Sequence, residues 1–259
     1  FNTVLYTGDG SGATVSGVGF QPDLNITKQR SGTESHFVVD AVRGVTKTIY
    51  TVDTSATDTY ANSLTAFNSD GYVHGDHQGY ATNTATYVSW NWKAGTTSGI
   101  NTTGSDITPS SYSFNQTAGF SILAYTGSGT SGDKLAHGLA ATPAWIMVKE
   151  IGGGSQWSCF HQSIGNTGAI VLNTTAATET DAGTGSWNYW HRTDPDSVNV
   201  TIGSTHYVNN TSDTYVAYCF TPKQGFSAMG SYKGNGNADG TFVYLGFRPA
   251  WVLIKRTDS

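Results

Sequence analysis

Apolar and polar positions alternate along most of this chain, and a period of two predicts short β-strands. The clearest run covers residues 84–92, where Val88, Trp90 and Trp92 lie on one side and intervening residues such as Ser89 lie on the other. Because successive strand side chains point to opposite faces of a sheet, we predict that the apolar side lines the core. No segment shows a clear 3.6-residue period, so the sequence predicts an all-β fold.

The chain repeats a set of sequence anchors at long, regular intervals. Each set opens with a phenylalanine, at Phe1, Phe120 and Phe226, and continues through a Gly to a Pro that precedes a strand ending in Lys. The prolines are Pro22, Pro143 and Pro249. Self-similarity with units of about 100 residues indicates a tandem array in which each unit can bury its own core. We therefore predict tandem antiparallel β-sandwich repeats, jelly-roll-like in arrangement.

The anchors divide the chain into four segments. These are a first repeat at residues 1–95, a Gly/Ser/Thr-rich connector at 96–119, a second repeat at 120–222 and the start of an incomplete third repeat at 223–259. Within the connector, Tyr112 and Phe114 alternate like the beginning of an extra strand of the second repeat. Because the sequence opens at Phe1, inside an anchor, we expect an excerpt from a longer polypeptide. The short joint at 221–225 favours units stacked in a stiff rod.

The end of the second repeat resembles the end of the first. Residues 213–220 stand where residues 85–92 stood, and the same alternation places three side chains on the predicted core face, namely Val216, Tyr218 and Phe220. We predict that these side chains and their counterparts in the first repeat are buried in two superposable sandwiches. Truncation of Trp90 to Ala would then cost about 3–5 kcal/mol.

Composition narrows the class of protein. Charged residues are only 12% of the chain, while aromatic residues also reach 12% and glycines number 32, a pattern typical of extracellular β-proteins with neutral surfaces. The net charge of −5, without a basic cluster, argues against a nucleic-acid partner. The sequence contains no run of about 20 apolar residues, so it predicts no membrane-spanning segment. Cys159 and Cys219 are too few for a disulfide scaffold and are expected to be free thiols.

Three motifs together carry a family resemblance. They are Tyr-Thr-Gly at residues 6–8 and 125–127, Gly-Phe-x-Pro at 19–22 and 246–249, and Thr-Tyr-Val-Ala-Tyr-Cys-Phe at 214–220. With them the chain resembles an uncharacterised β-sandwich repeat domain of structural proteins of tailed bacteriophages, and its units are loosely similar to concanavalin- and laminin-G-like sandwiches. The family has no established catalytic residues. The first repeat departs from the pattern with Asp23-Leu24 where the others have Ala-Trp, which suggests a different outer face.

The resemblance implies a virion structural protein, a tail fibre or another surface appendage that takes part in host attachment. Such a protein would lie on the virion surface and contact other virion proteins and a host surface glycan. Phage fibres of this family are usually trimers, so we expect a homo-oligomer, a trimer about a long axis. Sheet edges that carry Thr, Ser and Asn instead of Lys also leave backbone groups open to identical chains. The alternatives are a carbohydrate-binding module of a secreted adhesin, and a capsid decoration or extracellular filament protein.

The most aromatic loop, at residues 187–192, is the candidate glycan-binding site. Exposed Trp and Tyr rings stack on sugars because they combine a flat apolar face with a polar group, which makes Trp187, Tyr189 and Trp190 the candidate residues. The alternative is structural, since a Trp after a long polar loop can plug the end of a sandwich.

Metal-binding and catalytic patterns are weak. His74, Asp76 and His77 could reach one Zn²⁺, but no further His or Cys lies nearby, and a polar hairpin loop is the ordinary reading. Several aspartates could supply oxygen ligands for Ca²⁺, although turn formation is the default for them: Asp70, Asp76, Asp181, Asp194 and Asp196. The three glutamates, Glu34, Glu150 and Glu179, have no acidic partner at matched positions. We therefore predict no cofactor, no metal site and no enzymatic activity.

Overall fold

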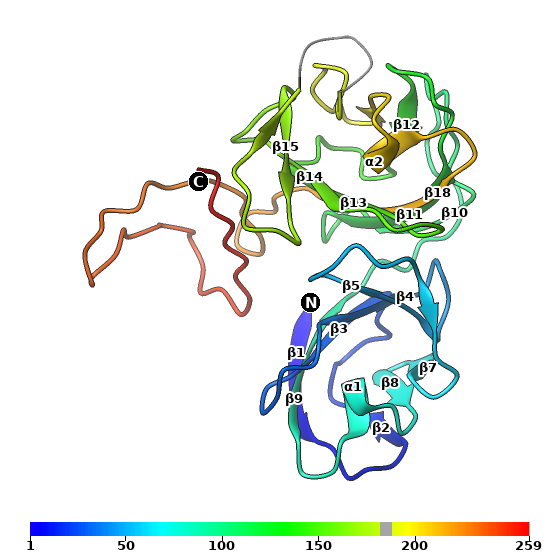
Figure 1. Cartoon of the computed structure of the whole chain (residues 1–259), viewed down its shortest axis with the longest axis vertical. Coiled ribbons are helices and arrows are strands. Elements are labelled where there is room, and N and C mark those ends of the chain that lie inside the picture. The colour runs from blue at the N-terminus through cyan, green and yellow to red at the C-terminus, as the bar shows by residue number, and fades with distance from the viewer. Residues whose placement is uncertain (182–187, 259) are drawn as a thin grey trace.

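Strands account for nearly all of the regular structure in residues 1–181 and 188–258, the part of the chain that the computed structural model describes (Figure 1). The fold is all-β, as predicted. The helices among these residues are two single turns, α1 (Gln78–Ala81) and α2 (His206–Asn209).

The first sandwich pairs a six-stranded sheet with a three-stranded sheet. The large sheet is antiparallel throughout and has the order β1-β9-β3-β4-β5-β6. Its strands are β1 (Asn2–Thr7), β9 (Thr86–Trp92), β3 (Leu24–Gln29), β4 (Phe37–Asp40), β5 (Lys47–Tyr50) and β6 (Asp58–Thr59). The small sheet consists of β2 (Ala13–Val15), β8 (Gly71–His74) and β7 (Leu64–Asn68), in that order.

The second sandwich pairs a seven-stranded sheet with a two-stranded sheet. The large sheet has the order β10-β11-β18-β13-β14-β15-β16. Its strands are β10 (Ser111–Asn115), β11 (Phe120–Thr126), β18 (Thr214–Phe220), β13 (Trp145–Glu150), β14 (Trp157–His161), β15 (Gly168–Val171) and β16 (Glu179–Thr180). The small sheet pairs β12 (Lys134–Ala136) with β17 (Asn199–Thr201). The predicted extra strand around Tyr112 and Phe114 is confirmed as β10.

The two large sheets share one topology. From β11 to β16 the second sheet follows the same order as the first sheet from β1 to β6. In both sandwiches a single-turn helix precedes the strand in question, β9 or β18, and a tyrosine of that strand bonds to the helix. The Tyr87 hydroxyl donates to the Gln78 carbonyl at 2.7 Å, and the Tyr215 hydroxyl donates to the His206 carbonyl at 2.6 Å. These correspondences support the predicted repetition, which remains our interpretation of the sequence.

Four sheets stack in the order small, large, large, small (Figure 1). Three buried clusters fill the spaces between them. One lies inside the first sandwich around Tyr72, and one lies inside the second sandwich around Trp190. The third takes residues from both large sheets, among them Trp92 and Trp145. Each large sheet therefore contributes buried residues from both of its faces.

The predicted orientation of the central strands is wrong. Ser89 in β9 is fully buried inside the first sandwich, whereas Trp90 is only half-buried on the opposite face. In β18, Cys219 belongs to the cluster inside the second sandwich, and Tyr218 belongs to the cluster between the sheets. The predicted burial of Val216, Tyr218, Phe220 and Trp92 is confirmed. The apolar face of each strand is buried against the other sandwich instead of against its own small sheet.

The interior of the first sandwich is unusually polar. The Asn25 side-chain amide donates to Asn91 Oδ1 at 2.9 Å, and Thr27 Oγ1 donates to Asn25 Oδ1 at 2.8 Å. The Asn91 amide in turn donates to Ser89 Oγ at 3.1 Å. These bonds satisfy groups that would otherwise be costly to bury. A polar interior explains why the apolar alternation of β9 pointed to the wrong side of the sheet.

Residues 223–258, which we name the C-terminal arm, contain no regular strand or helix (Figure 1). The predicted opening strands of a third repeat are therefore not formed in these residues. In the first sandwich β1 and β3 both pair with β9, in the second β11 and β13 both pair with β18, and the arm supplies no strand of that kind. The arm is anchored at several points, one of which is Trp251, whose ring lies edge-on 5.2 Å from the ring of Trp92.

Candidate functional site

An aromatic cluster joins the two large sheets. The rings of Trp92 in the first large sheet and Phe120 in the second lie 6.5 Å apart. Within the second sheet Trp145 and Phe220 stack at 4.7 Å, and within the first sandwich Phe1 packs on Trp92 at 4.8 Å. Trp251 lies against Trp92 and Trp145, so the cluster draws on both ends of the described chain. Aromatic pairs of this kind contribute about 0.5–1.5 kcal/mol each beyond the burial of their area. We call the whole region between the large sheets the inter-sheet contact.

A buried ion pair lies within the inter-sheet contact. Arg43 Nε donates to Asp40 Oδ2 at 2.6 Å, with side-chain exposures of 3% and 0%. From the opposite sheet, the Tyr218 hydroxyl donates to the same carboxylate oxygen at 2.6 Å. Burial raises the pKa of Tyr218 well above its usual value, so this hydroxyl stays protonated and remains a donor.

The remaining polar atoms of the ion pair also have partners. Asp40 Oδ1 accepts from the backbone amides of Val42 and Arg43 at 3.0 and 2.8 Å. The Arg43 guanidinium donates to carbonyl oxygens of β4 and β5 at 3.0 and 3.2 Å. A buried ion pair is tolerated only when such extra bonds offset the loss of hydration. The arrangement thus fixes the turn after β4 and links it to β18 of the other sandwich.

A second polar seam crosses the contact near β5 and β14. Trp157 Nε1 donates to the Tyr50 carbonyl at 2.7 Å. The Thr54 carbonyl accepts from the Ser155 amide at 2.8 Å and from Lys149 Nζ at 3.3 Å. Burial lowers the pKa of Lys149 to about 8. These directional bonds fix the sliding position of one sheet on the other, which apolar packing alone would leave less constrained.

A third seam ties the connector to the first sandwich through Asp23. Ser113 Oγ of β10 donates to Asp23 Oδ1 at 2.8 Å, and the Ala94 amide donates to Asp23 Oδ2 at 2.8 Å. Burial raises the pKa of this carboxyl group. Asp23, where the first repeat departs from the pattern, therefore binds the connector to the first sandwich. It does not create a different outer face, because Asp23 is buried.

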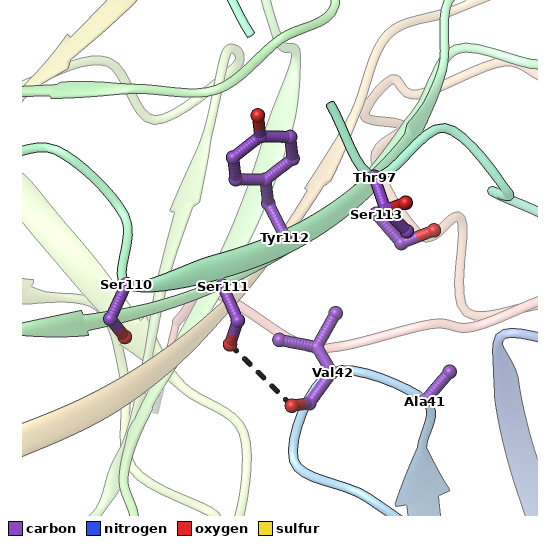
Figure 2. Close-up of a pocket in the computed structure, with 7 residues that line it drawn as sticks. All are labelled: Ala41, Val42, Thr97, Ser110, Ser111, Tyr112 and Ser113. Carbon is purple, nitrogen blue, oxygen red and sulfur yellow. Dashed lines mark hydrogen bonds between the residues drawn. The ribbon is translucent and has the colours of Figure 1, made fainter. Parts of the chain in front are cut away.

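A groove of about 330 Å³ opens between the turn after β4 and strand β10 (Figure 2). It is lined by Ala41, Val42, Thr97, Ser110, Ser111, Tyr112 and Ser113. Figure 2 shows Ser111 reaching toward Val42, whose carbonyl accepts its hydroxyl at 3.5 Å, while the Tyr112 ring points to the other side of β10. The lining has hydroxyl groups but no carboxylate, imidazole or thiol, so it offers hydrogen bonds without an acid or base.

A second groove, of about 210 Å³, lies between β1 and β2 at the side of the first sandwich. Its lining includes Val4 and Tyr6 of β1 and the buried His74 of β8. No strand of the described chain pairs with the outer edge of β1. We name this feature the edge groove.

Two of the three predicted glycan-binding residues are buried. Tyr189 is 4% exposed and Trp190 is 1% exposed. Trp190 Nε1 donates to the Gly168 carbonyl at 3.0 Å, and the Tyr189 hydroxyl donates to the Glu179 carboxylate. Neither ring offers a face to a sugar, and both close the end of the second sandwich, as the alternative reading expected. Trp187 lies outside the described residues.

The His74–His77 motif serves the hairpin loop. The His74 ring stacks on Tyr80 with centroids 5.8 Å apart, and burial lowers its pKa. His77 Nδ1 accepts from the Gly79 amide at 3.1 Å and so caps α1, while Asp76 accepts from Asn62. Within residues 1–181 and 188–258, no group of three or more His, Cys, Asp or Glu is placed to hold a metal ion.

The candidate calcium ligands take part in local turns and pairs. Asp70 accepts from the Gly17 and Gly19 amides, and Asp196 accepts from the Val198 and Asn199 amides. Asp181 pairs with Arg192 at 2.9 Å, and Asp194 accepts from Asn166. The contacts of Asp196 are those of a turn-forming aspartate. Asp70, Asp181 and Asp194 instead bond to residues that are distant in the sequence.

Neither the cysteines nor Glu34 and Glu150 form a paired site. Cys159 and Cys219 are free and buried, as expected, and burial raises the pKa of each thiol to about 12. Glu34 accepts from Gln78 in the first sandwich, whereas Glu150 is buried at the end of β13, where burial raises its pKa. The absence of enzymatic activity stays a prediction.

Sequence reasoning missed the ion pair of Asp40 and Arg43. The available signal was an acidic residue that ends an apolar strand, followed three positions later by arginine. That spacing is common in surface turns, so it gave no indication that the pair is buried under another sheet.

The comparisons with known proteins give a family without a function. No helix of the described residues is long and apolar enough to cross a membrane. Neither the curated proteins nor the solved structures contain a significant match to this chain. One protein family, described as Domain of unknown function (DUF7483), matches residues 1–259. The chain belongs to the DUF7483 family.

Proposed function

We propose that this chain is a stiff structural module of a virion surface appendage, a tail fibre or similar structure that takes part in host attachment. The inter-sheet contact is the observation that carries the proposal. Sandwiches on a flexible linker move independently, whereas a large apolar contact between domains restricts that motion. Here the aromatic cluster, the ion pair and two polar seams join the large sheets.

The virion setting comes from the motif resemblance. In that setting the module would stand outside the cell, contact other virion proteins and associate with copies of itself, most simply as a trimer. The burial of Tyr189 and Trp190 gives no support to a sugar-binding platform at those two rings. A host glycan would have to bind elsewhere, and the structural role is therefore the better supported candidate.

Stiffness is tested by a distance measurement across the stack. Spin labels on cysteines introduced at the exposed positions Ser11 and Thr117 would report on the two sandwiches, because the native thiols are buried. We expect one narrow distance distribution. A broad distribution in the wild-type background would show that the sandwiches move freely and would contradict the proposal.

The location is tested by labelling particles. Gold-labelled antibodies against this chain should mark a fibre on purified phage particles that encode it. Label confined to the capsid would favour a decoration protein, and unlabelled particles containing no peptide of this chain would rule out a virion role. A secreted adhesin would instead be found free of particles.

A further inference from the structure

The two sandwiches differ at one sheet edge. In the second sandwich β10 covers the outer edge of β11 from Phe120 to Ala124. Of the two aromatic residues of β10, the half-buried Tyr112 packs against the cluster inside that sandwich, and Phe114 is 7% exposed. Leu123 of β11, which β10 pairs with, and Tyr125 just beyond it are 0% and 1% exposed. A strand with aromatic residues two positions apart thus seals this edge.

The corresponding edge of the first sandwich is open. Val4 and Tyr6 of β1 stand where Leu123 and Tyr125 stand in β11, but they are only half-buried and line the edge groove. The Gly8 amide donates to the Ala85 carbonyl of the neighbouring strand at 2.8 Å, which fixes the hydrogen-bonding pattern of β1. By the alternation of antiparallel ladders, the odd-numbered amides of β1, including that of Leu5, point outward. The edge groove therefore offers a backbone edge and a slot whose walls are partly apolar, from Val4, Tyr6 and Val15, and partly polar.

The C-terminal arm carries a segment of matching pattern. Phe242 and Tyr244 are 86% and 83% exposed, the highest values among the large hydrophobic side chains that are exposed in the described chain. They are two positions apart, like Tyr112 and Phe114, so in an extended strand both would point to the same side. The arm also has five basic and two acidic residues, while the rest of the chain has eight basic and sixteen acidic residues. Opposite net charge favours the approach of an arm to a sandwich.

We propose that residues 241–245 of one copy add to β1 of a second copy as an antiparallel strand, with Phe242 and Tyr244 in the edge groove. A second copy is favoured over the same copy because residues 241–245 form no strand and do not pair with β1 of their own copy, although the same arm already packs on Phe1 and Trp92 through Trp251. The part of the arm before Trp251 lies to the side of the stack (Figure 1). The end of the arm is held on the second sandwich, where the Thr257 carbonyl accepts from the Thr178 amide at 3.0 Å and Lys255 Nζ donates to the Ala176 carbonyl at 2.9 Å. This inference rests on one part of the proposed function, namely that copies of this chain associate with one another.

The first test is the oligomeric state of arm variants, measured by size-exclusion chromatography with light scattering. We expect the wild type to associate at micromolar concentration and the double variant Phe242→Ser/Tyr244→Ser to be a monomer with unchanged thermal unfolding, because both side chains are exposed. Tyr232→Ser is the matched control, since Tyr232 is an exposed arm residue outside 241–245. It should associate like the wild type.

A second test locates the contact. Copies carrying Leu5→Cys and copies carrying Val243→Cys, prepared separately and mixed under mild oxidation, should form a disulfide-linked pair. Both positions are exposed, and both would lie on the same side of the joined strands. When the Val243→Cys copies also carry Phe242→Ser/Tyr244→Ser, the cross-link to the Leu5→Cys copies should be lost.

The outcomes separate this inference from the proposed function. An oligomer that persists in the double variant and forms no cross-link would overturn the inference and leave self-association in place. A wild type that stays monomeric would overturn both. A monomer in which β1 amides exchange slowly with solvent, and exchange faster in the double variant, would show that the arm closes the groove of its own copy and would also overturn the inference.

Discussion

Tyr218→Phe tests how much the buried ion pair contributes to holding the two large sheets together. The substitution keeps the ring and removes only the hydroxyl that donates to Asp40 at 2.6 Å. A hydrogen bond to a charged group contributes about 1.5–3 kcal/mol, so we expect the free energy of unfolding to fall by about 2 kcal/mol. For a chain of this size that corresponds to a Tm lower by about 4–8 °C.

A double-mutant cycle with Asp40→Asn separates the charge from the hydroxyl. Asp40→Asn leaves the Arg43 guanidinium buried beside a neutral amide and should cost about 3–5 kcal/mol. In that background Tyr218→Phe removes a neutral hydrogen bond of about 0.5–1.5 kcal/mol, so the two changes should be coupled by about 1 kcal/mol. Tyr125→Phe is the matched control, because its hydroxyl donates to the Val208 carbonyl inside the second sandwich, away from Asp40.

Urea unfolding followed by tryptophan fluorescence measures all of these free energies. The wild type should unfold in one transition, since the inter-sheet contact links the sandwiches. Strict additivity of Tyr218→Phe and Asp40→Asn, or a loss below about 0.5 kcal/mol for Tyr218→Phe, would refute the reasoning, because a charge-assisted bond in a dry contact cannot be that weak.

Three further predictions use the same unfolding assay. Burial lowers the pKa of the fully buried His137 to about 4. Between about pH 6.5 and pH 4 this imidazole is therefore protonated in the unfolded state and neutral in the folded state. His137 alone should therefore lower the stability by about 3 kcal/mol as the pH drops from about 6.5 to about 4. His137→Gln should reduce the pH slope without removing it, because burial also lowers the pKa of His74; an unchanged slope would contradict the assignment. Gly8→Ala and Gly127→Ala should each cost about 1–3 kcal/mol, since an added Cβ would lie 2.5 and 2.2 Å from the nearest carbonyl oxygen; clearly unequal losses would argue against their equivalence. Trp92→Ala should cost about 3–5 kcal/mol and the half-buried Trp90→Ala clearly less; the reverse order would restore the orientation predicted from sequence.

The sequence by itself determined the class and the positions of the strands. Alternation is a property of neighbouring residues, so it located β9 and β18 and even the short β10 without knowledge of what they contact. The repeated anchors likewise matched two sheets with the same strand order. These features are local, and local patterns survive whatever the rest of the chain does.

Tertiary structure decided which side of each strand meets which neighbour. A period of two defines two faces but does not say which face points to its own small sheet, and in this protein both faces of the large sheets contribute buried residues. The partner of Asp40 is Tyr218, 178 residues later in the chain, and no local pattern specifies such a pairing. The same holds for Trp190, whose ring would suit a sugar if exposed but is buried in the cluster inside the second sandwich. Burial depends on packing between distant segments, and only the folded chain brings those segments together.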